Sequence, residues 1–151
     1  MNLKTRIEDI AIFQTIRDLA GVHNIETYVI GGFVRDLIID RVSKQDIDIV
    51  CLGSGIHLAQ ILKKHLGDSA SLAVYKQFGT ACVKHQKLEI EFVGARKESY
   101  RSESRKPIVE EGTLEEDQNR RDFTINALAI SLNEKDFGEL TDPFDGITDA
   151  K

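Results

Sequence analysis

The sequence predicts an α+β protein in which helices pack on a mixed β-sheet. Apolar residues recur at helical spacing over residues 5–20, which indicates a helix with one buried face. Short apolar or alternating segments recur further along the chain and are typical of strands. In the first half of the chain, segments with a helical pattern lie between these predicted strands. Helices and strands that share one hydrophobic core define this class of fold.

The elements follow in order along the chain. Thr5 to Ala20 is predicted to be an amphipathic, core-facing helix and not a signal peptide, because charged residues separate its apolar ones. The later patterns predict a strand at 26–30, a helix at 32–40, a strand at 45–51, a helix at 55–66, strands near 71–75, 78–85 and 87–94, a helix at 117–132 and a short strand at 137–141.

The segment from Arg96 to Glu116 shows no clear periodicity, and it is too long for an ordinary connection. We therefore expect either a functional loop or a disordered one. Its first half is mainly basic and its end is acidic. The basic half is a candidate contact for triphosphate or RNA, and a solvated, flexible loop is the alternative.

Composition favours one compact domain, since 151 residues with 41% hydrophobic content can bury a sizeable core. The net charge of −5 argues against tight RNA binding by this segment, because RNA affinity usually depends on a basic surface. Cys51 and Cys82 lie in apolar runs and are expected to be buried, reduced thiols. The four histidines are scattered, so no zinc site is expected. No targeting or spanning segment is recognisable, and a cytoplasmic protein is expected.

The first candidate site is a two-glycine turn that follows an apolar strand. Tyr28-Val29-Ile30 runs into Gly31 and Gly32 and then into a short helix. Glycines let main-chain N–H groups approach a ligand, and a helix N-terminus attracts anions, so this turn is a candidate phosphate cradle. Arg35 is expected to reach a nucleotide or to lock the turn, and Asp36 to brace it.

The second candidate site is a pair of carboxylates on one strand. Asp46 and Asp48 alternate with apolar residues and so project from the same face. Two crowded carboxylates favour a hard divalent cation such as Mg²⁺, which also binds substrate phosphates. Glu89 and Glu91 share a face of a later strand, and either is a candidate third carboxylate. The alternative is that both belong to a solvated strand face.

A polar stripe marks the predicted helix at 117–132. Gln118, Asp122 and Asn126 are four residues apart, and Arg120 and Arg121 fall in its first turns. Cations at a helix N-terminus are unfavourable, so an anionic ligand would explain them. Solvated polar residues, or an ion pair with the glutamates at 115 and 116, are the alternative.

Four motifs follow one another over most of the chain. They are Gly-Gly-x-x-Arg-Asp, Asp46-Ile47-Asp48-Ile49-Val50, Arg-Arg-Asp-Phe-Thr-Ile-Asn-Ala at 120–127 and Asp-Pro-Phe-Asp-Gly at 142–146. Together they resemble the class II tRNA nucleotidyltransferase (CCA-adding enzyme) and bacterial poly(A) polymerase family. The resemblance implies the head domain of the DNA polymerase beta type superfamily over residues 1–151, with a mostly antiparallel sheet. It places Arg121 on the nucleotide and Asp122 with Asn126 near its ribose, and it favours Glu91 over Glu89.

The resemblance also implies an activity, namely template-independent transfer of a nucleotide from ATP or CTP to the 3′-hydroxyl of RNA. The expected main case is CCA addition to tRNA. Asp46 and Asp48 would hold two Mg²⁺ ions, and the triphosphate would lie at Gly31, Gly32 and Arg35. Poly(A), A-only or CC-only synthesis remain alternatives, because the neck, body and tail domains of the family are expected outside this chain. A non-catalytic nucleotide-binding domain is the rival of another class, and the intact aspartate pair argues against it.

Overall fold

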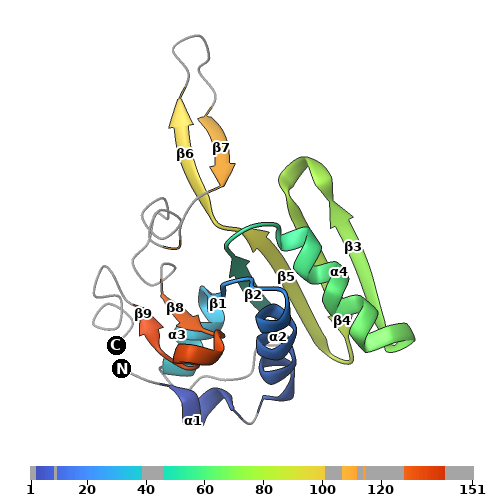
Figure 1. Cartoon of the computed structure of the whole chain (residues 1–151), viewed down its shortest axis with the longest axis vertical. Helices are drawn as coiled ribbons and strands as arrows, with labels where there is room; N and C mark the ends of the chain where they lie inside the picture. Colours follow the sequence, from blue (N-terminus) through green and yellow to red (C-terminus); the bar gives the residue numbers. More distant parts are fainter. Residues whose placement is uncertain are drawn as a thin grey trace.

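The computed structural model describes residues 3–8, 10–38, 46–100, 107–111, 114 and 128–141, and for 96–100 and 107–111 it describes the main chain. Its centre is a seven-stranded sheet in the order β3-β4-β5-β2-β1-β8-β9 (Figure 1). Neighbouring strands are antiparallel, except that β2 and β5 run parallel. The predicted α+β fold with a mixed, mostly antiparallel sheet is therefore confirmed.

The strands are β1 (Thr27–Ile30), β2 (Asp46–Cys51), β3 (Ala70–Tyr75), β4 (Thr80–His85), β5 (Leu88–Gly94), β8 (Ala129–Ser131) and β9 (Leu140–Thr141). The α-helices are α1 (Lys4–Ile7), α2 (Ala11–Val22), α3 (Gly32–Ile38) and α4 (Gly55–Leu66), and short 3₁₀ turns lie at Gly67–Ser69, Lys76–Phe78 and Glu134–Asp136. None of the helices in these described ranges is long and apolar enough to cross a membrane.

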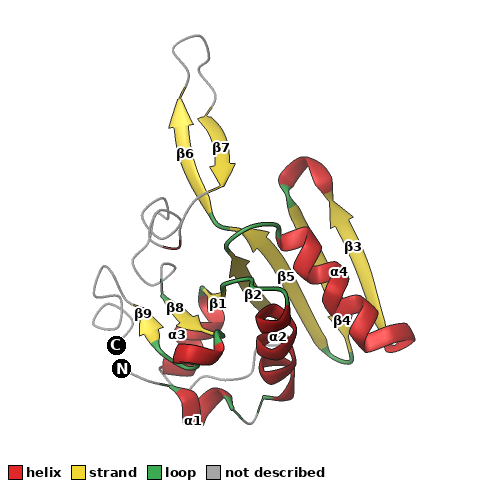
Figure 2. Ribbon diagram, viewed as in Figure 1, coloured by secondary structure: helices red, strands yellow, loops and turns green. Residues whose placement is uncertain are grey.

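Two helices, α2 and α4, cover one face of the sheet (Figure 2). The strands meet them with alternating apolar residues, so that Ile47, Ile90 and Phe92 are fully buried in the main core. Ser54 begins α4 as its N-cap, and its hydroxyl accepts a hydrogen bond from the His57 N–H at 3.1 Å. The other face of β2, β5 and β4 has no helix packed on it among the described elements, and this face carries the candidate site.

The single helix predicted from Thr5 to Ala20 is wrong in one respect, because two helices occupy the segment. Ile10 between them has an extended backbone, with φ −89° and ψ 99°. The break lets the chain turn so that Leu3 and Ile7 are buried, while the Leu3 N–H donates to the Gly138 carbonyl at 2.6 Å. Burial of two more apolar side chains outweighs the continuity of one helix.

The prediction of a helix through residue 132 is also wrong at its end. Ala129–Ser131 forms β8, which pairs with β1 on one side and β9 on the other. All three residues of the strand are buried. The rest of that predicted helix, with Arg120, Arg121, Asp122 and Asn126, lies outside the described residues, as does the Asp-Pro-Phe-Asp-Gly motif.

The segment expected to lack regular structure contains a two-stranded antiparallel sheet, β6 (Arg96–Tyr100) with β7 (Pro107–Glu111). Its register aligns Arg96 with Glu111 and Lys97 with Glu110. The expectation of an irregular loop is therefore wrong for these ten residues.

Candidate active site

The glycine turn and the aspartate pair come together because β1 lies beside β2. Ile30, the last residue of β1, is opposite Asp48 in the register. Gly31 follows with φ +78°, a backbone conformation that residues other than glycine rarely adopt. A Cβ placed at this position would lie 3.6 Å from Asp48 Oδ2. The first two motifs thus form one site.

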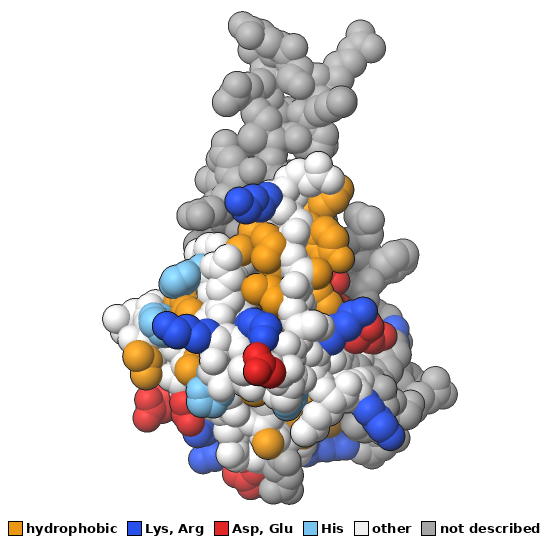
Figure 3. Space-filling model, turned by 90° about the vertical axis from the view of Figure 1, so that its right-hand side faces the viewer, with side chains coloured by type: hydrophobic (Ala, Val, Ile, Leu, Met, Phe, Trp, Pro, Cys, Tyr) orange, Lys and Arg blue, Asp and Glu red, His pale blue; other side chains and the backbone are white. Residues whose placement is uncertain are grey.

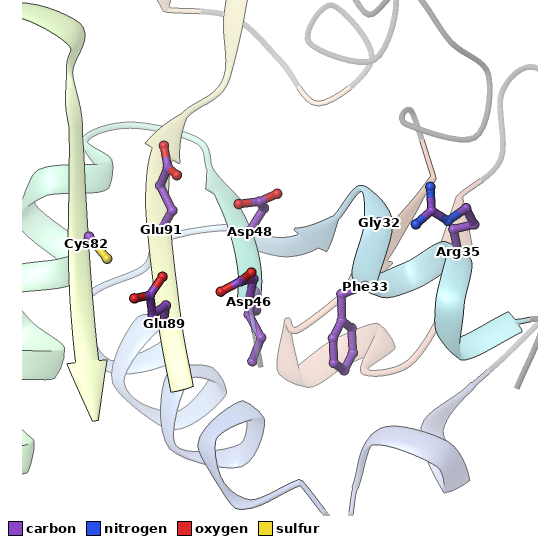
Figure 4. Close-up of a pocket in the computed structure, with 9 residues that line it drawn as sticks. Gly32, Phe33, Arg35, Asp46, Asp48, Cys82, Glu89 and Glu91 are labelled. Carbon is purple, nitrogen blue, oxygen red and sulfur yellow. The ribbon is translucent and has the colours of Figure 1, made fainter. Parts of the chain in front are cut away.

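The parallel pair β2–β5 adds two glutamates. Asp46 is in register with Glu89, and Asp48 with Glu91, so that four carboxylates lie on adjacent strands of the open face (Figure 4). All four side chains are exposed. Glu89 is partly neutralised by Lys84, whose Nζ lies 3.4 Å from Glu89 Oε1. The structure therefore brings both candidate glutamates into the site, with Glu91 beside Asp48.

These residues line an open pocket of about 530 Å³. Its walls consist of Gly32, Phe33, Arg35, Asp46, Ile47, Asp48, Cys82, Glu89 and Glu91. Phe33 points away from the carboxylates and packs edge to face on Phe13, with ring centroids 5.4 Å apart. A pocket with one arginine and four carboxylates favours bound cations.

Arg35 and Asp36 form a local pair at the edge of this pocket. Arg35 Nε donates to Asp36 Oδ1 at 3.1 Å, and Asp36 is only 6% exposed. The buried carboxylate thus holds the guanidinium of Arg35 through its Nε at the edge of the pocket. The Gly31 N–H donates to the Leu128 carbonyl at 3.3 Å. Gly31 thus supplies the turn conformation, and phosphate-facing N–H groups would come from Gly32 onward.

The donor chemistry of the pocket fits a hard divalent cation. Its oxygen donors are the carboxylates of Asp46, Asp48, Glu89 and Glu91, and Mg²⁺ prefers such oxygens over nitrogen or sulfur donors. Within the described ranges, no group of three or more His, Cys, Asp or Glu side chains is arranged to hold a metal ion by itself. Mg²⁺ commonly binds through one or two carboxylates and completes its shell with water and substrate phosphates. The aspartate pair meets that requirement.

Two thiols differ in their surroundings. Cys51 is fully buried, and burial raises its pKa to about 12. Cys82 lies on the pocket wall and is only partly buried, so the expectation of a buried thiol is wrong for this residue. Burial is the main cause that raises the pKa of Cys82, and the charge of Glu89 adds to it.

Alkylation should separate these thiols. Because the thiolate is the reactive form, we expect iodoacetamide at pH 8 to modify Cys82 more slowly than an unfolded thiol and to leave Cys51 unmodified. The rate at Cys82 should increase with pH, since a raised pKa leaves little thiolate at pH 8. Peptide mass spectrometry against time measures both rates, and the guanidinium-unfolded protein is the control. Faster modification of Cys51 than of Cys82 would contradict the burial assignment.

Comparison with known proteins identifies the class of the fold. The structure of this chain aligns with a solved CCA-adding enzyme in its apo form II at a TM-score of 0.86 and 36% identity, over 99% of this chain and 36% of that chain. A tRNA nucleotidyltransferase complexed with a primer tRNA and an incoming ATP analog aligns at a TM-score of 0.74 and 38% identity, over 89% of this chain and 36% of the other. The fold is thus that of nucleotidyltransferase head domains.

The family follows from the sequence match. Residues 27–151 match the family model described as poly A polymerase head domain, and the chain belongs to that family. An A-adding tRNA nucleotidyltransferase of Aquifex aeolicus is 42% identical over 127 residues, which are 84% of this chain and 15% of that protein. The chain therefore spans a small part of the length of this relative, and about a third of the solved chains.

Proposed function

We propose that this domain catalyses template-independent transfer of a nucleotide from an NTP to the 3′-hydroxyl of RNA. The observation that supports it most directly is the placement of Asp46 and Asp48 on one exposed strand face, with Asp48 beside the Gly31 turn. Phosphoryl transfer requires mostly positioning and charge stabilisation, which carboxylate-bound metal ions and a glycine turn provide. The relatives named for tRNA substrates favour the 3′ end of tRNA as acceptor.

Two Mg²⁺ ions, when bound, would activate the RNA hydroxyl and stabilise the leaving pyrophosphate. Asp46 and Asp48 would hold them. Glu91, in register beside Asp48, would add a third negative charge to the site, as the resemblance favours, while Lys84 partly neutralises Glu89. At the other end of the pocket, Gly32 and Arg35 would bind the triphosphate.

The remaining nucleotide contacts are proposed from the resemblance alone. Arg121 would contact the nucleotide, and Asp122 with Asn126 would contact its ribose. We also propose that residues 1–151 are the catalytic head of a longer enzyme whose neck, body and tail select the base and bind most of the tRNA. We expect the enzyme to use ATP and CTP and to act in the cytoplasm, where its tRNA substrate is.

CCA addition is the main proposal, and A-adding activity is the alternative that a specific observation favours, since the Aquifex relative is named A-adding. Poly(A) synthesis, CC-only addition and a non-catalytic nucleotide-binding role would use the same head fold. These possibilities differ in the nucleotides that are incorporated.

Three tRNA acceptors decide between them. The first ends just before the two cytidines of the CCA end, the second ends after the first cytidine, and the third ends after both. The full-length protein is incubated with Mg²⁺ and either CTP or ATP. A CCA-adding enzyme adds C to the first two acceptors and A only to the third. An A-adding enzyme extends only the third, and a poly(A) polymerase adds many adenylates. No incorporation with any acceptor would exclude nucleotide transfer and favour the non-catalytic role.

A further inference from the structure

The open face of the sheet extends beyond the active-site pocket to Tyr75, and a second exposed aromatic residue, Phe78, follows in the next turn. Tyr75, the last residue of β3, is 51% exposed, and Phe78 in the following 3₁₀ turn is 60% exposed. Within the described residues, the other large hydrophobic side chain with comparable exposure is Val22, on α2. Lys76 is also exposed and lies between the two aromatic residues in the chain.

Strand register places Tyr75 on the same face as the catalytic carboxylates. A row of directly opposed residues runs from Asp48 to Glu91, Cys82 and Ala73, across β2, β5, β4 and β3. Tyr75 is two residues beyond Ala73 and therefore points to the same side. The intervening Val74 packs against the core on the opposite side. Figure 3 shows hydrophobic side chains gathered along this edge of the molecule.

The distance from Asp48 to Tyr75 follows from sheet geometry. Three strand spacings of about 4.8 Å and two residues of about 3.4 Å along a strand give roughly 16 Å. Nucleotides stacked as in a helix advance about 3.4 Å each, so about four or five of them cover this distance. A more extended strand would cover it with fewer.

We propose that Tyr75 and Phe78, together with Lys76, form a stacking site for bases of the single-stranded 3′ end of the acceptor RNA. The inference rests on the proposed function, because the acceptor hydroxyl must reach Asp46 and Asp48. The triphosphate occupies the Gly32 and Arg35 end of the pocket, so the acceptor approaches over β5, β4 and β3. That path ends at Tyr75, and Phe78 follows three residues later in the adjoining turn.

Charge explains why stacking is the suitable interaction here. The chain has a net charge of −5 and its pocket carries four carboxylates, which repel the RNA backbone. Aromatic side chains bind any base through its π-face, an interaction that does not itself depend on a positive charge. Lys76 adds one positive charge where the strand leaves the acidic pocket. Tyr75 and Phe78 are thus positioning residues, which hold the acceptor without contact to the reacting atoms.

Steady-state kinetics of the full-length protein tests the proposal. Tyr75→Ala should raise KM for a tRNA acceptor roughly fivefold or more, with kcat at saturating tRNA changed by less than about twofold. Tyr75→Phe keeps the ring and should restore the wild-type KM. Val22→Ala removes an exposed apolar side chain elsewhere and should change neither constant.

Base removal in the acceptor supplies a second test. Abasic nucleotides placed singly at the second to fifth positions from the 3′ end should raise KM at one or two positions for the wild type. The same substitutions should have little further effect with the Tyr75→Ala, Phe78→Ala double variant, because both changes remove one stacking contact. Thermal unfolding verifies that the variants are folded.

The two hypotheses fail in different ways. Unchanged KM in the folded double variant, with wild-type transfer intact, would overturn the stacking site and leave the proposed function standing; such an edge would suit a protein partner instead. Equal losses in Tyr75→Phe and Tyr75→Ala would also overturn it. Absence of transfer by the wild type would overturn the proposed function. Fluorescence anisotropy with a labelled single-stranded RNA then still tests the stacking site. The Tyr75→Ala variant should bind this RNA more weakly than the wild type, and equal binding would overturn the stacking site.

Discussion

Replacement of Asp48 by asparagine should reduce nucleotide transfer about a thousandfold or more and leave the fold intact. The amide keeps the size of the side chain but removes a negative charge that would bind the metal ions, and such a loss costs several kcal/mol in the transition state. Stability should not fall, because one of four crowded carboxylates on the open face is removed and repulsion between the rest decreases. Single-turnover incorporation of radiolabelled nucleotide measures the effect.

Glu89→Gln is the matched control for this substitution. It removes a carboxylate from the same pocket, but one that already pairs with Lys84 at the surface. We expect less than about a tenfold change in rate, since exposed ion pairs contribute little. Asp46→Ala should behave like the Asp48 variant. Wild-type turnover by Asp48→Asn would exclude the assignment of the aspartate pair as the metal site.

Substitution of Gly55 by alanine should destabilise the protein by about 2–3 kcal/mol. Gly55 is the first residue of α4, where the helix crosses β5 closely. A Cβ at this position would lie 2.7 Å from the Val93 nitrogen and 2.8 Å from its Cα, which are main-chain atoms that cannot rotate away. The helix or the strand would have to shift. Urea unfolding monitored by circular dichroism measures the change.

Gly21→Ala provides the opposite expectation in the same kind of element. Gly21 lies near the end of α2, and a Cβ there would meet no heavy atom within 4 Å. We expect a gain of about 0.5–1 kcal/mol, because alanine loses less conformational entropy in a helix. Equal unfolding midpoints of the two variants would show that the close approach at Gly55 is relieved without cost.

Strand faces were predictable from sequence where one side is buried and the other is solvated. Asp46 and Asp48 alternate with Ile47 and Ile49, and burial follows the same alternation. β8 was not predictable in this way. Leu128 to Leu132 is buried throughout, because β8 lies between two other strands and has both faces covered. A run that is apolar except for Ser131 has neither a helical nor a strand period, so the helical pattern before it was taken to continue into it.

The relation between the two glutamates and the aspartates depended on pairing between distant strands. Local alternation shows that Glu89 and Glu91 share a face, but it does not show which strand lies beside them. Only the parallel register of β2 with β5 sets Glu91 opposite Asp48. The pairing of β6 with β7 likewise depended on a register that the local pattern does not show.

The parallel β2–β5 pair also has a consequence for the order of folding. β3, β4 and β5 are joined by short turns, so they can pair early with little loop entropy. β2 and β5 are separated by a helix and two strands, and their contact must close a long loop. That step also crowds four like charges. We therefore expect the pairing of β2 with β5, which creates the acidic pocket, to be the last slow step of folding. The rate of this step should increase when Mg²⁺ or added salt screens the carboxylates.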